Sequence, residues 1–187
     1  NKPGLLLSGL SILFIVFIIP LNSYLAWLNA GLDLPGWLDT LERWMIRKEA
    51  QAEFLTEILI NTGSWQGLML KLLVIAIIPA IGEEFLYRGI LQNIFRGWLR
   101  SGILAVVLTA ILFSATHFQF YGFVPRFILG LGFGLIYLWS GNIWLPVIAH
   151  LVNNSIPVIL SFLMGWENIN SSLDSFSSED GLLAIIP

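Results

Sequence analysis

Three ionisable side chains interrupt an otherwise apolar stretch of the chain, from Val74 to Leu91. Glu83, Glu84 and Arg88 lie where a membrane helix would be hydrophobic, and a charge at the bilayer centre costs about 3 kcal/mol on insertion scales. At about 100° per residue, Glu84 and Arg88 share one helix face and can pair, whereas Glu83 points elsewhere. We therefore expect Glu83 to be free to meet groups from other helices, as a general base must.

The sequence contains two histidines, and both are expected in apolar helices. His117 closes the segment F-S-A-T-H, while His150 and Asn154 are four residues apart and project from one helix face. Lipid penalises all of these polar groups, so we expect them to converge with Glu83 inside the bundle. A carboxylate that accepts a proton, a histidine that orients water and a His/Asn pair that holds an oxyanion are the parts needed for water attack on an amide.

Other interpretations of the same residues stay open. Two histidines and a carboxylate could bind zinc, although the chain lacks an H-E-x-x-H motif and Asn154 is a poor zinc ligand. A proton-coupled transporter also uses intramembrane Glu and His, but no internal repeat is evident. Each group could also be a hydrogen-bonded structural residue, and the charges a structural ion cluster, in a scaffold or partner-binding protein.

The composition bounds the class of protein. Of 187 residues, 57% are hydrophobic and 11% are charged, about half the charged fraction of soluble domains, which indicates an integral membrane protein forming one helical bundle. The absence of cysteine excludes thiolate catalysis and cysteine-bound metal. With a net charge of -3 and scattered basic residues, nucleic acid is not an expected partner.

The apolar pattern predicts an all-α polytopic protein with about five membrane-spanning segments and one interfacial helix. A single domain is expected over residues 1–165, with its motif core at about 66–164, and a polar, partly mobile tail over 166–187. Residues 33–64 alternate apolar and charged side chains at helical spacing, which favours an amphipathic connector at the membrane surface that could also border an active site. The expected spans are residues 5–28, 65–96 (bent or broken around Pro79 and Gly82), 103–118, 126–139 and 143–164.

Taken in order, E-E-F-L-Y-R, F-S-A-T-H and H-L-V-N-N form a recognisable set. They resemble the CAAX proteases and bacteriocin-processing enzymes family, the type II CAAX prenyl endopeptidase-like intramembrane proteases. That family carries E-E-x-x-x-R, then F-x-x-x-H, then H-x-x-x-N on successive membrane helices. This sequence has Glu83-Glu84-x-x-x-Arg88, Phe113-x-x-x-His117 and His150-x-x-x-Asn154.

The resemblance implies a role for each matching residue. Glu83 corresponds to the general base that activates water, His117 to its partner in holding that water, and His150 and Asn154 to the oxyanion-stabilising pair. Glu84 and Arg88 correspond to the supporting Glu and Arg of the first motif. The family is described as glutamate-dependent and without catalytic metal, although it was first classed among metalloendopeptidases; the expectation is therefore no cofactor, with zinc as the alternative.

The resemblance also implies an intramembrane endopeptidase that cleaves a membrane-anchored peptide or protein, with membrane lipid as its other partner. Eukaryotic members remove the last three residues of prenylated proteins, whereas some prokaryotic members are linked to bacteriocin maturation or self-immunity. The short chain lacks the extra helices of larger members, so we expect a compact protein of a prokaryotic cell membrane without a prenylated substrate. The alternative is a proteolytically silent scaffold or immunity protein that keeps the motifs.

Overall fold

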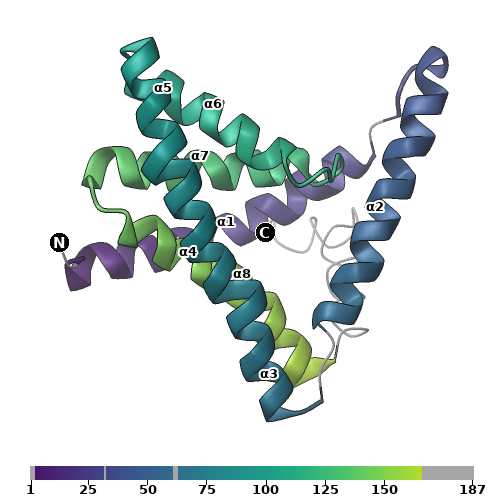
Figure 1. The fold of residues 1–187 in the computed structure, drawn as a ribbon. Helices are drawn as coiled ribbons and strands as arrows, with labels where there is room; N and C mark the ends of the chain where they lie inside the picture. The colour runs from purple at the N-terminus through teal and green to yellow at the C-terminus, as the bar shows by residue number, and fades with distance from the viewer. Residues whose placement is uncertain (1–2, 32, 61–62, 166–187) are drawn as a thin grey trace, which may run out of the picture.

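The computed structural model describes residues 3–31, 33–60 and 63–165, and these form helices joined by short turns (Figure 1). The tail expected over 166–187 lies outside the described residues. The all-α prediction is confirmed. The elements are α1 (Leu5–Ala30), η1 (Gly36–Leu38), α2 (Asp39–Ile60), α3 (Trp65–Lys71), η2 (Leu72–Ile77), α4 (Ile78–Glu84), η3 (Phe85–Leu91), α5 (Gln92–Leu99), α6 (Gly102–Ala115), α7 (Phe123–Ser140) and α8 (Trp144–Met164).

The elements from α3 to α5 follow one another without a gap and form one long rod (Figure 1). The break considered around Pro79 and Gly82 does not occur; instead, η2 and η3 widen the helix into π-helical turns on either side of α4. Pro79 has no N–H, so the carbonyl of Ile75 loses its usual partner four residues on. Nδ2 of Asn154 donates to that carbonyl at 3.2 Å. The rod is therefore widened where the last helix contributes a side chain to it.

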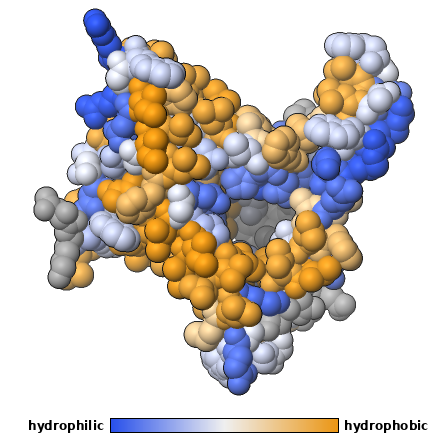
Figure 2. All heavy atoms as spheres, viewed as in Figure 1, coloured by the Kyte–Doolittle hydropathy of each residue, from blue (hydrophilic) through white to orange (hydrophobic). Residues whose placement is uncertain are grey.

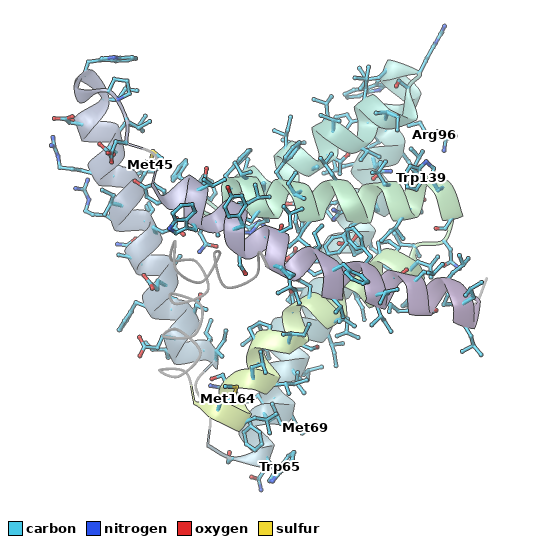
Figure 3. All side chains as sticks on the ribbon, turned by 180° about the vertical axis from the view of Figure 1, so that it is seen from behind. Met45, Trp65, Met69, Arg96, Trp139 and Met164 are labelled. Atoms are coloured by element: carbon cyan, nitrogen blue, oxygen red, sulfur yellow. The ribbon has the colours of Figure 1, made fainter. Side chains whose placement is uncertain are left out.

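The first half of this rod packs against α8, which runs in the opposite direction. Figure 3 shows Trp65 and Met69 at the same end of the molecule as Met164, far from Arg96 and Trp139. The rings of Trp65 and Phe162 are 4.8 Å apart. Further along α8, buried Ala149 joins Phe133 of α7 and two isoleucines of α1 in a core cluster. The helices that carry the polar motifs are thus held side by side by apolar contacts.

Glycines bring α7 close to its neighbours at residues 130, 132 and 134. Arg88 and Gln92, one turn apart on the rod, donate to the carbonyls of Gly130 and Gly134, each at 3.0 Å. A Cβ at Gly134 would lie 2.8 Å from Cγ1 of Val106. Small residues are therefore required where α7 meets α6 and the rod.

Gly134→Ala is expected to lower the free energy of unfolding by about 1 to 3 kcal/mol, because the added methyl group overlaps the stiff, buried side chain of Val106. Gly97→Ala in α5 is the matched control, because a Cβ there meets open space. That change should stabilise the helix by about 0.5 to 1 kcal/mol. In thermal unfolding measured in detergent, the midpoint of Gly134→Ala should lie below that of wild type and the midpoint of Gly97→Ala above it. If both midpoints shift in the same direction, the close contact between Gly134 and Val106 is contradicted.

Three helices are long and apolar enough to cross a membrane: Leu5–Asn29, Phe123–Ser140 and Trp144–Met164. The other two expected spans are the rod, which the central charges interrupt, and α6, a shorter apolar helix of 14 residues. Hydrophobic residues cover much of the outer surface of the bundle (Figure 2). These features are those of a polytopic membrane protein.

The helix α2 stands at the side of the bundle (Figure 1). Hydrophilic residues lie along it and near the hollow between α2 and the bundle (Figure 2). The ring of Trp44 lies 5.2 Å from that of Phe120, and Nζ of Lys71 donates to the carbonyl of Ile58 at 3.4 Å. The amphipathic helix predicted over residues 33–64 is therefore present, and it begins later and ends earlier than its hydrophobic pattern.

Candidate active site

The described residues line a cavity of about 480 Å³, open on one side, between the rod, α7, α8 and α2. It contains all four residues that the sequence singled out as catalytic. Glu83 comes from α4, His150 and Asn154 from α8, and His117 from the turn after α6. The lining residues are Ala26, Thr56, Ile75, Glu83, Phe113, His117, Gly122, Pro125, Arg126, Leu129, Phe133, His150, Asn153, Asn154 and Pro157.

The carboxylate of Glu83 is the point where the two histidines meet. Its Oε2 lies 3.9 Å from Nε2 of His117 and 3.9 Å from Nε2 of His150. This oxygen is buried and has no hydrogen-bond partner within the described part of the chain. A single water with hydrogen bonds of about 2.8 Å bridges atoms roughly 4 to 5 Å apart. Each Glu83–histidine pair is therefore spaced to be bridged by one water, whose two hydrogens can be donated to the carboxylate and to one of the two Nε2 atoms.

His117 was expected at the end of an apolar helix, but α6 ends at Ala115 and His117 lies in the following turn. The chain reverses there, with Phe118 in the left-handed region at φ 54°. Nδ1 of His117 lies 2.7 Å from the carbonyl oxygen of Phe113. Because a carbonyl can only accept, Nδ1 carries the hydrogen, and Nε2 of the neutral ring is an acceptor that faces Glu83.

Glu84 and Arg88 form the ion pair that their spacing predicts, and both side chains are 0% exposed. Nη1 of Arg88 donates to Oε1 of Glu84 at 2.9 Å, and the same oxygen lies 2.7 Å from Nδ1 of His150. Nδ1 therefore carries the hydrogen of a neutral His150, and Nε2 is left as an acceptor toward Glu83. The Glu84–Arg88 pair thus fixes the orientation of the His150 ring through Nδ1, on the side of the ring away from Glu83.

Two phenylalanines hold the polar groups in place. The ring of Phe113 meets the rings of His117 at 5.1 Å and His150 at 5.9 Å, and the guanidinium carbon of Arg88 lies 4.7 Å above it. Phe133 stacks on His150 at 5.1 Å, with 19° between the ring planes. The sequence analysis singled out Phe113 but not Phe133, which lies on a separate helix and gives no signal by spacing.

The amide of Asn154 is held at both ends. Its Oδ1 accepts from Nδ2 of Asn153 at 3.1 Å, and its own Nδ2 donates to Ile75 at 3.2 Å. An amide nitrogen carries two hydrogens. One N–H of Asn154 thus remains for a molecule in the cavity.

Sequence reasoning also missed Arg126 of α7, which lines the cavity. Its Nη2 donates to Oε1 of Gln119 at 2.5 Å, and it interacts electrostatically with Glu49 of α2 and with Glu83. Burial raises the pKa of the Glu49 carboxyl above its usual range, and the backbone amide of Tyr121 and the Arg126 guanidinium oppose this only in part. With Thr56 in the cavity wall, α2 is a border of the site as well as a connector.

No three His, Cys, Asp or Glu side chains within residues 3–31, 33–60 and 63–165 are grouped in a way that could hold a metal ion. The hydrogen bonds at both Nδ1 atoms leave the Nε2 atoms as the cavity-facing nitrogens of the histidines. Removal of metal by a chelator remains the direct test of the zinc alternative.

Comparison with known proteins gives partial matches to bacterial sequences. An uncharacterized 24.3 kDa protein of Escherichia coli is 34% identical over 87 residues, which cover 44% of this chain and 40% of that protein. Uncharacterized protein YpbD of Bacillus subtilis is 28% identical over 86 residues, 44% of this chain and 41% of that protein. The membrane-embedded CAAX protease MroQ of Staphylococcus aureus is 30% identical over 95 residues, 48% of this chain and 38% of that protein.

These alignments span about two-fifths of the length of the curated relatives. No solved structure matches the chain. Residues 65–156 match the family model of the Rce1-like type II CAAX prenyl endopeptidases, and this segment contains Glu83, His117, His150 and Asn154. Over residues 65–156 the chain belongs to the Rce1-like family of type II CAAX prenyl endopeptidases.

Proposed function

We propose that this protein is an intramembrane endopeptidase that hydrolyses a peptide bond with water activated by Glu83. The observation that carries the proposal is the convergence of Oε2 of Glu83 and the Nε2 atoms of His117 and His150, 3.9 Å from the carboxylate, in one cavity. A water held there can donate one hydrogen to the Glu83 carboxylate, which takes its proton, and the other to one Nε2 atom, which leaves its lone pairs for attack on a substrate carbonyl. Family membership supports a protein substrate.

In the proposed reaction, Glu83 takes a proton from the water as the oxygen attacks the carbonyl carbon. The proton must then reach the leaving nitrogen when the C–N bond breaks. His150 is suited to relay it, because its Nε2 lies 3.9 Å from Glu83 and its Nδ1 hydrogen is held by Glu84. The products are a carboxylic acid and an amine, and Glu83 is regenerated.

The oxyanion that forms during attack needs hydrogen-bond donors. Asn154 can donate its remaining Nδ2–H without a change of protonation. His150 carries its ring hydrogen on Nδ1, so Nε2 can donate only after it has accepted the proton that Glu83 took from the water. The proposed oxyanion pair therefore works in sequence: Asn154 from the start, and His150 as the imidazolium.

The proposal further includes a membrane-anchored substrate and a prokaryotic cell membrane. The apolar helices and the three bacterial relatives support this setting. The alternative, a non-proteolytic scaffold or immunity protein, makes no use of the Glu83 carboxylate as a base.

The test is cleavage of a library of membrane-anchored peptides by the full chain in liposomes, followed by mass spectrometry. Wild type, wild type with a chelator, and Glu83→Gln are compared. Cleavage that persists with the chelator and disappears in Glu83→Gln is the expected result. Cleavage abolished by the chelator and restored by zinc would support the metal mechanism instead, and equal cleavage by wild type and Glu83→Gln would remove Glu83 from the mechanism.

Asn154→Ala is expected to lower kcat by roughly 10²- to 10³-fold, because an oxyanion donor is lost, with a smaller change in KM. Asn93→Ala is the matched control: Asn93 also donates from Nδ2 to helix carbonyls, those of Arg88 and Gly89, but does not line the cavity. Both variants lose carbonyl hydrogen bonds, so both should unfold more easily. An equal loss of kcat in the two would show that Asn154 acts through helix stability alone.

A further inference from the structure

One guanidinium in the cavity has no part in the proposed hydrolysis. Arg126 sits in the first turn of α7 and shares the cavity with Glu83 and His117. The turn before it makes room for the side chain, because a Cβ at Gly122 would lie only 3.3 Å from Nη1 of Arg126. The backbone is thus shaped to admit this arginine at the cavity wall.

The hydrogen-bond donors of Arg126 are only partly used. Nη2 is bound to Gln119, whereas Nη1 is buried and has no hydrogen-bond partner within the described ranges. Glu49 and Glu83 interact with the guanidinium electrostatically, yet neither accepts a hydrogen bond from Nη1. A buried charged donor without an acceptor is costly, and a planar carboxylate is the ligand whose geometry matches a guanidinium.

Arg126 and the proposed oxyanion donors are held by different elements. Gln119 and Glu49, from the turn and α2, surround Arg126, whereas Asn154 of α8 is bound to Ile75 of the rod. A substrate in this cavity can therefore meet Asn154 with its reacting carbonyl and Arg126 with another group.

We infer that Arg126 binds a carboxylate of the substrate near the scissile bond and thereby selects acidic peptides. This inference rests on the proposed peptidase function. The carboxylate can come from an acidic side chain or from the C-terminus of the peptide. In either case Arg126 contributes to substrate binding, while Glu83 and Asn154 act on the reacting atoms.

The first test measures binding without turnover. Glu83→Gln protein in detergent is treated with phenylglyoxal, which modifies accessible guanidinium groups, and Arg126 is quantified by mass spectrometry. The probes are acylated peptides of one sequence in three forms: a free C-terminal acid, a C-terminal amide, and the amide with an internal Asn replaced by Asp. Exposed Arg96, at the far end of the rod (Figure 3), is the internal control.

A carboxylate-bearing peptide at saturation should slow modification of Arg126 about tenfold and leave Arg96 unaffected, while the neutral amide protects neither. Protection by the C-terminal acid identifies the terminus as the source, and protection by the Asp peptide identifies a side chain. Equal protection by charged and neutral forms, or none, would overturn the inference. If Arg126 is protected by the carboxylate peptides but the wild-type protein cleaves none of them, carboxylate binding at Arg126 is kept while its role in selecting a peptidase substrate is overturned together with the proposed peptidase.

The second test separates binding from chemistry. Arg126→Gln should raise KM for the carboxylate peptide by roughly ten- to a hundredfold and change kcat less than about twofold, with little effect on the neutral peptide. Arg126→Lys keeps the charge but not the planar guanidinium, so its KM for the carboxylate peptide should lie between those of wild type and Arg126→Gln. A similar fall in kcat for both peptides would assign Arg126 to the oxyanion or to the positioning of Glu83, and would refute substrate selection.

Discussion

Glu83→Gln is expected to lower the rate of peptide cleavage by about three orders of magnitude or more, at the upper end of the effect of a general base. Glutamine is nearly isosteric with glutamate but cannot take the proton of the attacking water. The unpartnered Oε2 of Glu83 is the atom that both histidines face. The measurement is single-turnover cleavage of a peptide that wild type processes, so that product release does not mask the chemical step.

Two controls make this result specific. Glu57→Gln, on the exposed side of α2, makes the same change away from the cavity and should leave the rate unchanged. The unfolding midpoint of Glu83→Gln should equal or exceed that of wild type, since the substitution removes a half-buried charge whose Oε2 has no hydrogen-bond partner among the described residues. An active Glu83→Gln protein, or one that is inactive only because it unfolds, would contradict the role proposed for Glu83.

Arg88→Met should destabilise the protein by about 3 to 5 kcal/mol, because it leaves the fully buried carboxylate of Glu84 without its counter-charge. The variant also loses the hydrogen bond to the carbonyl of Gly130 and the contact with the Phe113 ring. Adding Glu84→Gln should recover part of the loss, because the orphaned charge is then gone. The measurement is chemical or thermal unfolding in detergent for the single and double variants.

A second pair in this chain provides the control at the same spacing. Arg43 and Asp39 are also four residues apart on one helix, at 3.9 Å, but their side chains are 62% and 56% exposed. Arg43→Met should cost at most about 0.5 kcal/mol. Similar losses at Arg43 and Arg88 would show that burial does not set the strength of the central pair.

The part of the candidate site that lies on one helix could be predicted from the helical period. Four-residue spacing is sufficient to pair Glu84 with Arg88 and to place Glu83 on another face. The spacing could not show that His150, 66 residues away, donates to the same Glu84 oxygen that Arg88 contacts. Likewise, Arg126 and Glu49 show no recurring spacing, so only the approach of α2 to the turn before α7 reveals them.

The end of α6 illustrates a different limit. The apolar run through Phe118 predicted a helix that carries His117, yet the chain leaves the helix after Ala115. The Thr116 hydroxyl lies 2.6 Å from the Tyr87 hydroxyl and donates to the carbonyl of Phe113, while Nδ1 of His117 meets the same carbonyl. Side-chain hydrogen bonds thus take over from the backbone ladder at this helix end.

The sequence by itself determined the membrane class, the helical architecture and the set of residues worth testing, because bilayer energetics and the 3.6-residue period act locally along the chain. Tertiary structure alone decided which of these side chains meet, which ring nitrogen each histidine turns to the cavity, and that Asn154 donates to the carbonyl of Ile75, whose donor four residues on is missing at Pro79. Those outcomes depend on how helices cross and where turns place their ends. No periodicity within a single helix records that information.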